Sequence, residues 1–267
     1  MRSLIPLIMS LIAGLSTVIG AFILFLSKEK NNRLITFSLA YSAGVMITVS
    51  FTDLFTSAEE VLTKAHGSLK GIILSCLFLL IGSFLAYLID EFIPDDPKGS
   101  INRYTNSNEK LYRVGLVSMI ALIIHNFPEG VATFISGYQN TSLGIYVTLA
   151  IALHNIPEGI TIAMPIYYST RSKKQAFKYT LYSGLAEPLG ALVAFLFLRP
   201  YISEVILAIT FALVAGIMLY IAFAELIPTA RIYKHNKVYL FSIFLGILTI
   251  VVSHMYSHWI SIKLILQ

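Results

Sequence analysis

Hydrophobic residues in this chain form long runs separated by short polar segments. Each run is about 20 residues long, which is enough for an α-helix rising about 1.5 Å per residue to cross a hydrocarbon core about 30 Å thick. The runs and their breakers predict eight transmembrane helices and thus an all-α polytopic membrane protein, with one transmembrane domain over 1–267. The approximate bounds of these helices are 4–27, 34–56, 71–89, 114–136, 143–167, 179–198, 205–228 and 238–260.

The longest polar segment joins the third and fourth hydrophobic runs, at about 90–113. It is rich in proline, serine, asparagine and aspartate, and such a composition buries too little apolar surface to fold. We therefore expect a flexible cytoplasmic loop there. The first run begins almost at Met1 and lacks a small-residue cleavage pattern, which indicates a retained helix rather than a removed signal peptide.

Composition and charge agree with a membrane protein and predict its orientation. Hydrophobic residues make up 57% of the chain and charged residues 12%, whereas soluble domains carry roughly a quarter charged residues. The net charge of +5 comes from basic residues in short loops, so it reports orientation rather than an affinity for nucleic acid. The loops after the first, third, fifth and seventh helices hold 14 of the 19 lysines and arginines. Both termini are therefore expected on the non-cytoplasmic side of the cell membrane.

A six-residue polar motif occurs twice within these hydrophobic runs. His125–Gly130 reads HNFPEG, and His154–Gly159, one helix and one short loop further along, reads HNIPEG. The two helices are consecutive and joined by a short loop, so they run in opposite directions and their motifs can face each other as an inverted repeat. We therefore predict a symmetric site where the fourth and fifth helices meet.

Each motif combines metal-binding groups on one face of a helix. His125 and Glu129, like His154 and Glu158, are four residues apart, about one helical turn. Imidazole nitrogen, carboxylate oxygen and the amide oxygen of the adjacent asparagine suit zinc, iron, manganese, cobalt or nickel. The single cysteine, Cys76, excludes a thiolate cluster within one chain. Two such sets facing each other could hold one ion or two neighbouring ions with bridging carboxylates.

Acidic residues inside hydrophobic helices also indicate function, because each costs about 2.5–3.5 kcal/mol or more at the centre of an isolated helix. No lysine or arginine is predicted deep enough in a span to neutralise them. Glu187, followed by a proline in the sixth helix, is a candidate additional ligand. Asp53, near the outer end of the second helix, and Glu225, near the cytoplasmic end of the seventh, are candidate positions where the ion enters and leaves. The five acidic residues in predicted spans are Asp53, Glu129, Glu158, Glu187 and Glu225.

Some of these residues also have a purely structural interpretation. Asp53 can equally be a protonated acid that hydrogen-bonds to a neighbouring helix. Met46 on the second helix is another candidate residue on the ion's path, although methionine is more often used for packing. His254 and His258 lie near a helix end beside Trp259, where an interfacial position explains them.

Two further segments complete a family resemblance. The sixth helix contains SGLAEPLGA, and the seventh contains AGIMLYIAFAELIP. Together with the doubled motif, these segments resemble the ZIP (Zrt-, Irt-like) divalent metal transporters, especially their GufA-like branch. The resemblance covers nearly the whole chain. It implies eight helices in a 3+2+3 arrangement with an inverted repeat, a homodimer, and uptake of zinc, iron, manganese or cadmium into the cytoplasm.

The resemblance also implies a ligand set for a two-ion centre of Zn²⁺ or Fe²⁺. In the seventh helix, Ala224 stands before Glu225 where many relatives have a histidine, which argues against a strong outlying site there. The implied ligands are His125, Asn126, Glu129, His154, Asn155, Glu158 and Glu187.

The main alternative function is that of an intramembrane zinc metalloprotease, which also places histidine and glutamate on membrane helices. Zincin-like proteases use HExxH, in which a glutamate general base follows the first histidine. Asparagine follows each histidine here and cannot act as a base, so we expect neither an enzyme nor a catalytic cofactor. A proton-coupled carrier of organic solutes would explain the buried acids but not two histidines at matched positions.

Overall fold

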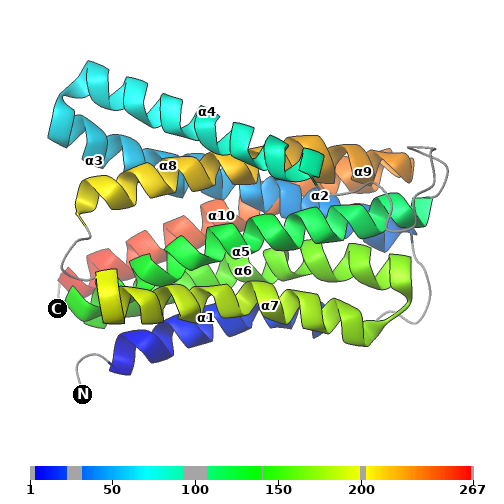
Figure 1. The fold of residues 1–267 in the computed structure, drawn as a ribbon, viewed down its shortest axis with the longest axis horizontal. Coiled ribbons are helices and arrows are strands. Elements are labelled where there is room, and N and C mark those ends of the chain that lie inside the picture. Colours follow the sequence, from blue (N-terminus) through cyan, green and yellow to red (C-terminus); the bar gives the residue numbers. More distant parts are fainter. Residues whose placement is uncertain (1–3, 23–31, 93–106, 140, 199–202, 266–267) are drawn as a thin grey trace.

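The computed structural model describes residues 4–22, 32–92, 107–139, 141–198 and 203–265, which are helical apart from short turns. The helices lie along one common direction and form an elongated bundle (Figure 1). Eight spans among these residues are long and apolar enough to cross a membrane, which confirms the predicted number and class. In chain order the elements, with η denoting a π-helix, are α1 (Leu4–Phe22), α2 (Asn32–Val49), η2 (Ser50–Phe55), α3 (Thr56–His66), α4 (Ser68–Phe92), α5 (Ser107–Gln139), α6 (Thr141–Thr170), α7 (Lys173–Val193), η3 (Ala194–Leu198), α8 (Glu204–Tyr220), η4 (Ile221–Leu226), α9 (Ile227–Ile232) and α10 (Asn236–Ile265).

The second span is longer than hydrophobicity predicts. Because η2 joins α2 to α3 without a break, one helical span of 35 residues runs over Asn32–His66. The turn into α4 follows at Gly67, whose φ of 87° suits glycine and few other residues. The helix therefore continues well beyond Asp53, and the prediction that Asp53 lies near a helix end is wrong.

The segment predicted as a loop at about 90–113 is helical at both of its ends. α4 continues two residues beyond Asp90, and α5 begins six residues before Arg113; the intervening 93–106 lie outside the described residues. Helices can extend beyond the hydrocarbon core, and their ends then contain polar residues such as Glu109 in the first turn of α5. Hydrophobicity alone assigns such turns to loops.

The bundle has a central group of four helices and two outer pairs. In the central group α5 packs along α6 and α7, and α1 also packs along α6 and α7. Outside this group, α10 packs mainly along α2, and α4 packs mainly along α8 and α3. α4 and α10 are the least buried of the eight spans, as expected for helices that face lipid. The central group is thus the part of the protein in which polar side chains can be kept away from lipid.

These contacts follow an inverted repeat that relates the first three spans to the last three. The contact of α2 with α10 corresponds to that of α8 with α4, and the contact of α1 with α6 corresponds to that of α7 with α5. The outer pairs even share a close glycine contact. A Cβ atom at Gly44 would overlap the carbonyl oxygen of Ile243, and a Cβ atom at Gly216 would overlap that of Leu79. The helices are therefore arranged as 3+2+3, with α5 and α6 as the middle pair.

The π-helices η2 and η4 lie at equivalent places in this repeat. The shift along the sequence that superimposes Gly44 on Gly216 also superimposes Asp53 in η2 on Glu225 in η4. π-Helical turns are rare and are frequent at functional sites. Both acidic residues thus lie in widened helical turns at corresponding positions of the two halves.

Candidate metal centre

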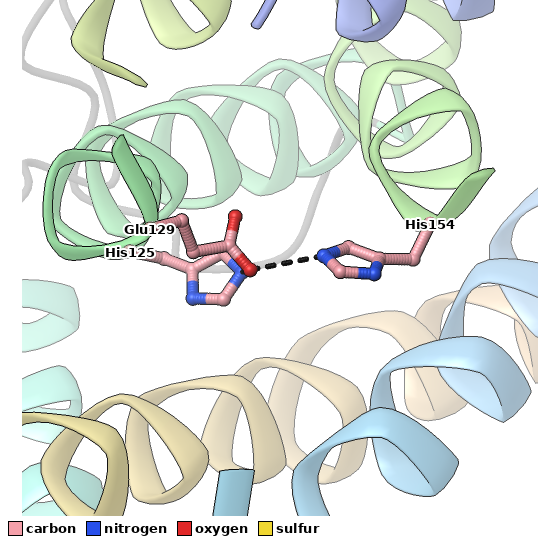
Figure 2. Close-up of side chains that lie close together, drawn as sticks. All are labelled: His125, Glu129 and His154. Carbon is pink, nitrogen blue, oxygen red and sulfur yellow. Dashed lines mark hydrogen bonds and ion pairs between the residues drawn. The ribbon is translucent and has the colours of Figure 1, made fainter. Parts of the chain in front are cut away.

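The two repeated motifs meet in the middle of the bundle, where α5 and α6 pack against each other. Figure 2 shows the Glu129 carboxylate of α5 pointing towards the imidazole of His154 on α6. Nε2 of His154 lies 2.9 Å from Oε1 of Glu129, and Nε2 of His125 lies 3.2 Å from the same oxygen. The two imidazole rings are 6.4 Å apart between their centroids. The predicted meeting of the two histidines across the helix contact is therefore present.

Glu158 completes this group from the α6 side. Its Oε1 lies 3.1 Å from Nε2 of His125, so each histidine is close to a glutamate of the opposite helix. Donor atoms of His125, Glu129 and His154 all lie within 4.8 Å of one another. One ligand atom each from these three side chains can therefore approach a single ion.

The group is deeply buried and poorly supplied with hydrogen-bond partners. The side chains of His125 and Glu158 are 0% exposed, that of Glu129 is 5% exposed and that of His154 is 10% exposed. Although Nε2 of His125 is close to two carboxylates, the contacts are not aligned as hydrogen bonds. Both carboxylate oxygens of Glu158 also lack a hydrogen-bond partner among the described residues. Buried polar atoms are normally hydrogen-bonded. Unsatisfied nitrogen and oxygen atoms that converge in this way suit the coordination of a cation.

Two asparagines flank the group, and each donates its amide hydrogens to the protein rather than to the glutamates of the motifs. Nδ2 of Asn126 donates to the carbonyl oxygen of Ser183 at 3.1 Å. Nδ2 of Asn155 donates to the carbonyl oxygen of Ala13 at 3.0 Å and to Oε2 of Glu187 at 2.8 Å. Within the part of the chain that the structure describes, the Oδ1 atoms of both asparagines have no hydrogen-bond partners. The amides are thus oriented with their oxygens free, which is the orientation that a metal ligand needs.

Glu187 reaches this region from α7 because α5 and α7 approach closely. A Cβ atom at Gly130 would overlap the carbonyl oxygen of Glu187, so no larger residue fits at that position of the motif. Glu187 is fully buried, and its Oε1 has no hydrogen-bond partner in the described segments. It lies next to Asn155 rather than within the tight group of His125, Glu129 and His154.

The inverted repeat reveals one asymmetry in the centre. A Cβ atom at Gly159 would overlap the carbonyl oxygen of Thr17 on α1, just as one at Gly130 would overlap that of Glu187 on α7. The shift along the sequence that superimposes Gly14 on Gly184 also superimposes Thr17 on Glu187. Thr17 is therefore the counterpart of Glu187, and the third carboxylate of the centre belongs to one half of the protein only. Sequence reasoning missed this correspondence because the doubled motif drew attention to α5 and α6.

The three buried glutamates of this region have no basic counter-charge beyond the histidines. In the described part of the chain, Glu129, Glu158 and Glu187 form no ion pair with lysine or arginine. Three carboxylates near two imidazoles leave an excess of negative charge when ionised. Protons, a bound divalent cation or both would neutralise it, which are the sources of positive charge expected from the sequence.

Asp53 lies outside this centre. Its side chain is 41% exposed, and Oδ1 lies 2.7 Å from Nε2 of His254 on α10. The interfacial interpretation of His254 did not anticipate this contact, since the two residues are far apart in the sequence. Met46, by contrast, is fully buried in the hydrophobic core. This position fits the packing role that was weighed from the sequence against a position on the path of the ion.

Glu225 also lies outside the centre, and here a sequence-based expectation is wrong. Its Oε1 lies 3.5 Å from NH1 of Arg113, a residue assigned from the sequence to a loop. The acid is buried, and its side chain is 9% exposed. A basic residue thus does reach a membrane-spanning acid. The helix-forming residues before Arg113 were the signal that could have placed it in α5.

Comparison with known proteins finds similarity to zinc transporters. The sequence model of a family described as "ZIP Zinc transporter" matches residues 96–254. A protein of Streptococcus mutans called zinc transporter ZupT is 44% identical over 250 residues, covering 92% of this chain and 95% of the relative. A protein of the same name from Oceanobacillus iheyensis is 42% identical over 267 residues, covering 94% and 97%. Another from Clostridium perfringens is 38% identical over 270 residues, covering 94% and 95%.

Proposed function

The chain belongs to the ZIP zinc transporter family, and from that membership we propose that it carries zinc across the cell membrane through the buried centre between α5 and α6. The relatives that cover nearly its whole length are named as zinc transporters. The observation that carries the proposal for this chain is the buried group of His125, Glu129 and His154, whose donor atoms lie within 4.8 Å of one another. Imidazole and carboxylate ligands suit Zn²⁺, which binds them at about 2.0–2.2 Å.

We further propose that the centre holds two ions. The first would be bound by His125, His154, Glu129 and Glu158. The unpartnered oxygens of the asparagines and of Glu187 support a second ion, which would share the two glutamates of the motifs. Iron, manganese and cadmium remain predicted alternative cargoes, since such nitrogen and oxygen ligands discriminate weakly among divalent metals. The proposed second-ion ligands are Asn126, Asn155 and Glu187.

The direction of transport is proposed from the charge pattern. Because 14 of the 19 basic residues lie in the loops and helix ends that are expected to be cytoplasmic, both termini would lie outside and zinc would move inwards. Asp53 would then meet the ion near the outer side, and Glu225 would meet it near the cytoplasmic side. One transmembrane domain over 1–267, a homodimer and membership of the GufA-like branch remain predictions.

An intramembrane metalloprotease is disfavoured by the chemistry of the centre as well as by the family. The residue after each histidine is an asparagine whose nitrogen is engaged by a main-chain carbonyl. It offers no general base for activating water. The chain is a transporter and not an enzyme.

Uptake into proteoliposomes tests the proposal. The purified chain is reconstituted with a zinc-sensitive dye inside, and dye fluorescence is followed after zinc is added outside. Glu158→Ala removes a buried carboxylate of the centre, so uptake should fall to the rate of protein-free liposomes. Glu60→Ala is the matched control, because Glu60 is exposed and pairs only with Lys64 on the same helix. Equal uptake by the wild type and Glu158→Ala would refute the proposed site, and peptidase activity would restore the alternative.

A further inference from the structure

A cluster of charged and polar side chains lies at the end of the bundle where α4 ends and α5 begins. NH1 of Arg113 lies 2.8 Å from Oδ1 of Asp90 and 3.5 Å from Oε1 of Glu225. NH2 of Arg113 donates to the main-chain oxygen of Asp90 at 2.7 Å, and the hydroxyl of Tyr220 donates to Oδ2 of Asp90 at 2.8 Å. The side chains of the three charged residues are 9% to 20% exposed. One guanidinium thus connects α5 to both α4 and η4.

These contacts join helices that otherwise touch little. α4 packs mainly along α8 and α3, whereas α5 packs mainly along α6 and α7. Arg113 is on the same helix as His125 and Glu129 of the metal centre, about 18 Å before His125 along the helix axis. It therefore connects the helix that carries metal ligands to an outer helix pair, at the proposed cytoplasmic end.

The opposite end of the bundle has no comparable arginine among the residues that the structure describes. In the inverted repeat, Asp53 corresponds to Glu225, and the sequence shift that superimposes Gly82 on Gly246 superimposes Asp90 on His254. The counterpart of this partly buried cluster is therefore the half-exposed contact between Asp53 and His254.

The middle pair of helices shows the same difference between the two ends. The shift that superimposes the first polar motif on the second superimposes Arg113 on Ser142, which is exposed. Arginine stays charged at all physiological pH values and its fork contacts two groups at once. The two ends of the bundle are thus held differently.

We propose that Arg113 acts as a latch that keeps the cytoplasmic end of the ion path closed between transport events, a role that rests on the proposed function. For zinc to leave, Arg113 releases Asp90 and Glu225, and the end of α5 separates from α4 and η4. A departing dication favours this release, because it repels the guanidinium and attracts the same carboxylates. Arg113 is thus a positioning residue, which acts on the path rather than on the ion.

The test measures access to α5 from the cytoplasmic side. With the native cysteine removed by Cys76→Ser, Ser118→Cys places a thiol seven residues before His125, on the same face of α5. Ser118 is fully buried and its hydroxyl has no hydrogen-bond partner in the described residues. Ser10→Cys on α1 is the matched control, since Ser10 is equally buried and equally without a partner there. Both thiols are labelled with a membrane-impermeant reagent in vesicles that expose the cytoplasmic side.

Arg113→Gln should raise the labelling rate of Ser118→Cys roughly tenfold or more, as expected for loss of charge-assisted hydrogen bonds, and leave Ser10→Cys unchanged. Arg113→Lys should give an intermediate rate, because a point charge keeps part of the contact. Glu225→Gln, which removes only the longer contact and is the milder change for folding, should raise the rate less than Arg113→Gln. Unchanged labelling of Ser118→Cys in both Arg113→Gln and Glu225→Gln, or an equal rise at Ser10→Cys, would overturn the latch and indicate no role or a merely structural one.

The labelling result is independent of zinc transport. Uptake by the wild type and by Glu158→Ala is measured in the same preparation. If the wild type takes up no zinc, the proposed function fails, while the labelling rates still report whether Arg113 closes this end. If the wild type transports zinc and labelling does not depend on Arg113, only the latch fails.

Discussion

Acidic side chains have different partners in the middle of the bundle and towards its ends. In the middle, Glu129 and Glu158 lie beside two imidazoles, and several of their oxygens lack hydrogen-bond partners. Towards the ends, Asp53 contacts His254 and Glu225 contacts Arg113. Arg113 stays charged and neutralises Glu225 without an ion, and the half-exposed Asp53 is solvated by water. The buried acids of the middle have only histidines beside them. The difference supports the proposal that the middle binds the ion and that the ends control access to it.

The largest effect is expected from removing the carboxylate of Glu129, which contacts both histidines. Glu129→Ala should lower zinc uptake at least about 100-fold, which is more than the loss of a group that only supports a ligand would cause. The reason is that Glu129 is itself a proposed ligand and contacts both histidines. Zinc binding measured by calorimetry should fall with it. Glu60→Ala, a change on an exposed helix face, is the control for handling and folding. If uptake by Glu129→Ala falls no further than uptake by Asp53→Ala, the acids in the middle and at the ends do not differ in function.

A second test addresses the asymmetry within the middle. Glu187→Thr gives α7 the residue that α1 has at the corresponding position, Thr17. We expect the zinc bound per purified chain to fall from two ions to one, and uptake to fall by about 30-fold, within the range for ligand-supporting groups. Metal content measured by mass spectrometry after gel filtration gives the count. A count that does not change on substitution would contradict the role of Glu187 in the second site.

Acidification should weaken zinc binding in the middle of the bundle more than interactions at its ends. Binding a dication requires neutral imidazoles and ionised carboxylates, so protons compete with zinc as pH falls through the ordinary histidine pKa of about 6.5. Lowering pH from about 7.5 to about 5.5 on both sides of the membrane should therefore reduce uptake about tenfold. Equal pH on the two sides separates this competition from any proton gradient. A flat profile would argue against His125 and His154 as ligands.

The smallest expected effect is at Asp53, near the proposed outer end. Asp53 is half-exposed, so its charge is screened by water and salt and mainly raises the local concentration of cations. Asp53→Ala should raise the KM for zinc about threefold and leave the ion count of the purified chain unchanged. The effect should shrink at high ionic strength. Loss of a bound ion in this variant would make Asp53 part of a binding site and not merely a point of access.

Much of this architecture could be predicted from the sequence, because its determinants are local. Span number follows from hydrophobic length, and the meeting of His125 with His154 follows from a repeated motif on consecutive antiparallel helices. Helix ends could not be predicted in the same way. Arg113 lies in polar turns of α5 that hydrophobicity assigns to a loop, and η2 continues a helix that seemed complete.

Contacts between distant segments were also beyond the sequence pattern. Asp53 and His254 meet because α10 packs along α2, a pairing that no local signal encodes. The correspondence of Thr17 with Glu187 needs the glycine contacts of both halves to become visible. Such features depend on how helices are paired in space, and single-helix periodicity contains no information on that pairing.

Because Asp53 and Glu225 lie in π-helices, the direction of each acidic side chain depends on the number of residues in the turn as well as on the residue itself. A π-helical turn accommodates a residue more than an α-helical turn of similar rise. Deleting one residue within Ser50–Phe55 would remove the extra residue of this turn, so the segment would revert to α-helix and its side chains would point in new directions. The aspartate would then turn away from His254 although every side chain nearby had been kept. Insertions and deletions in this segment are therefore as damaging as substitutions of the acid itself.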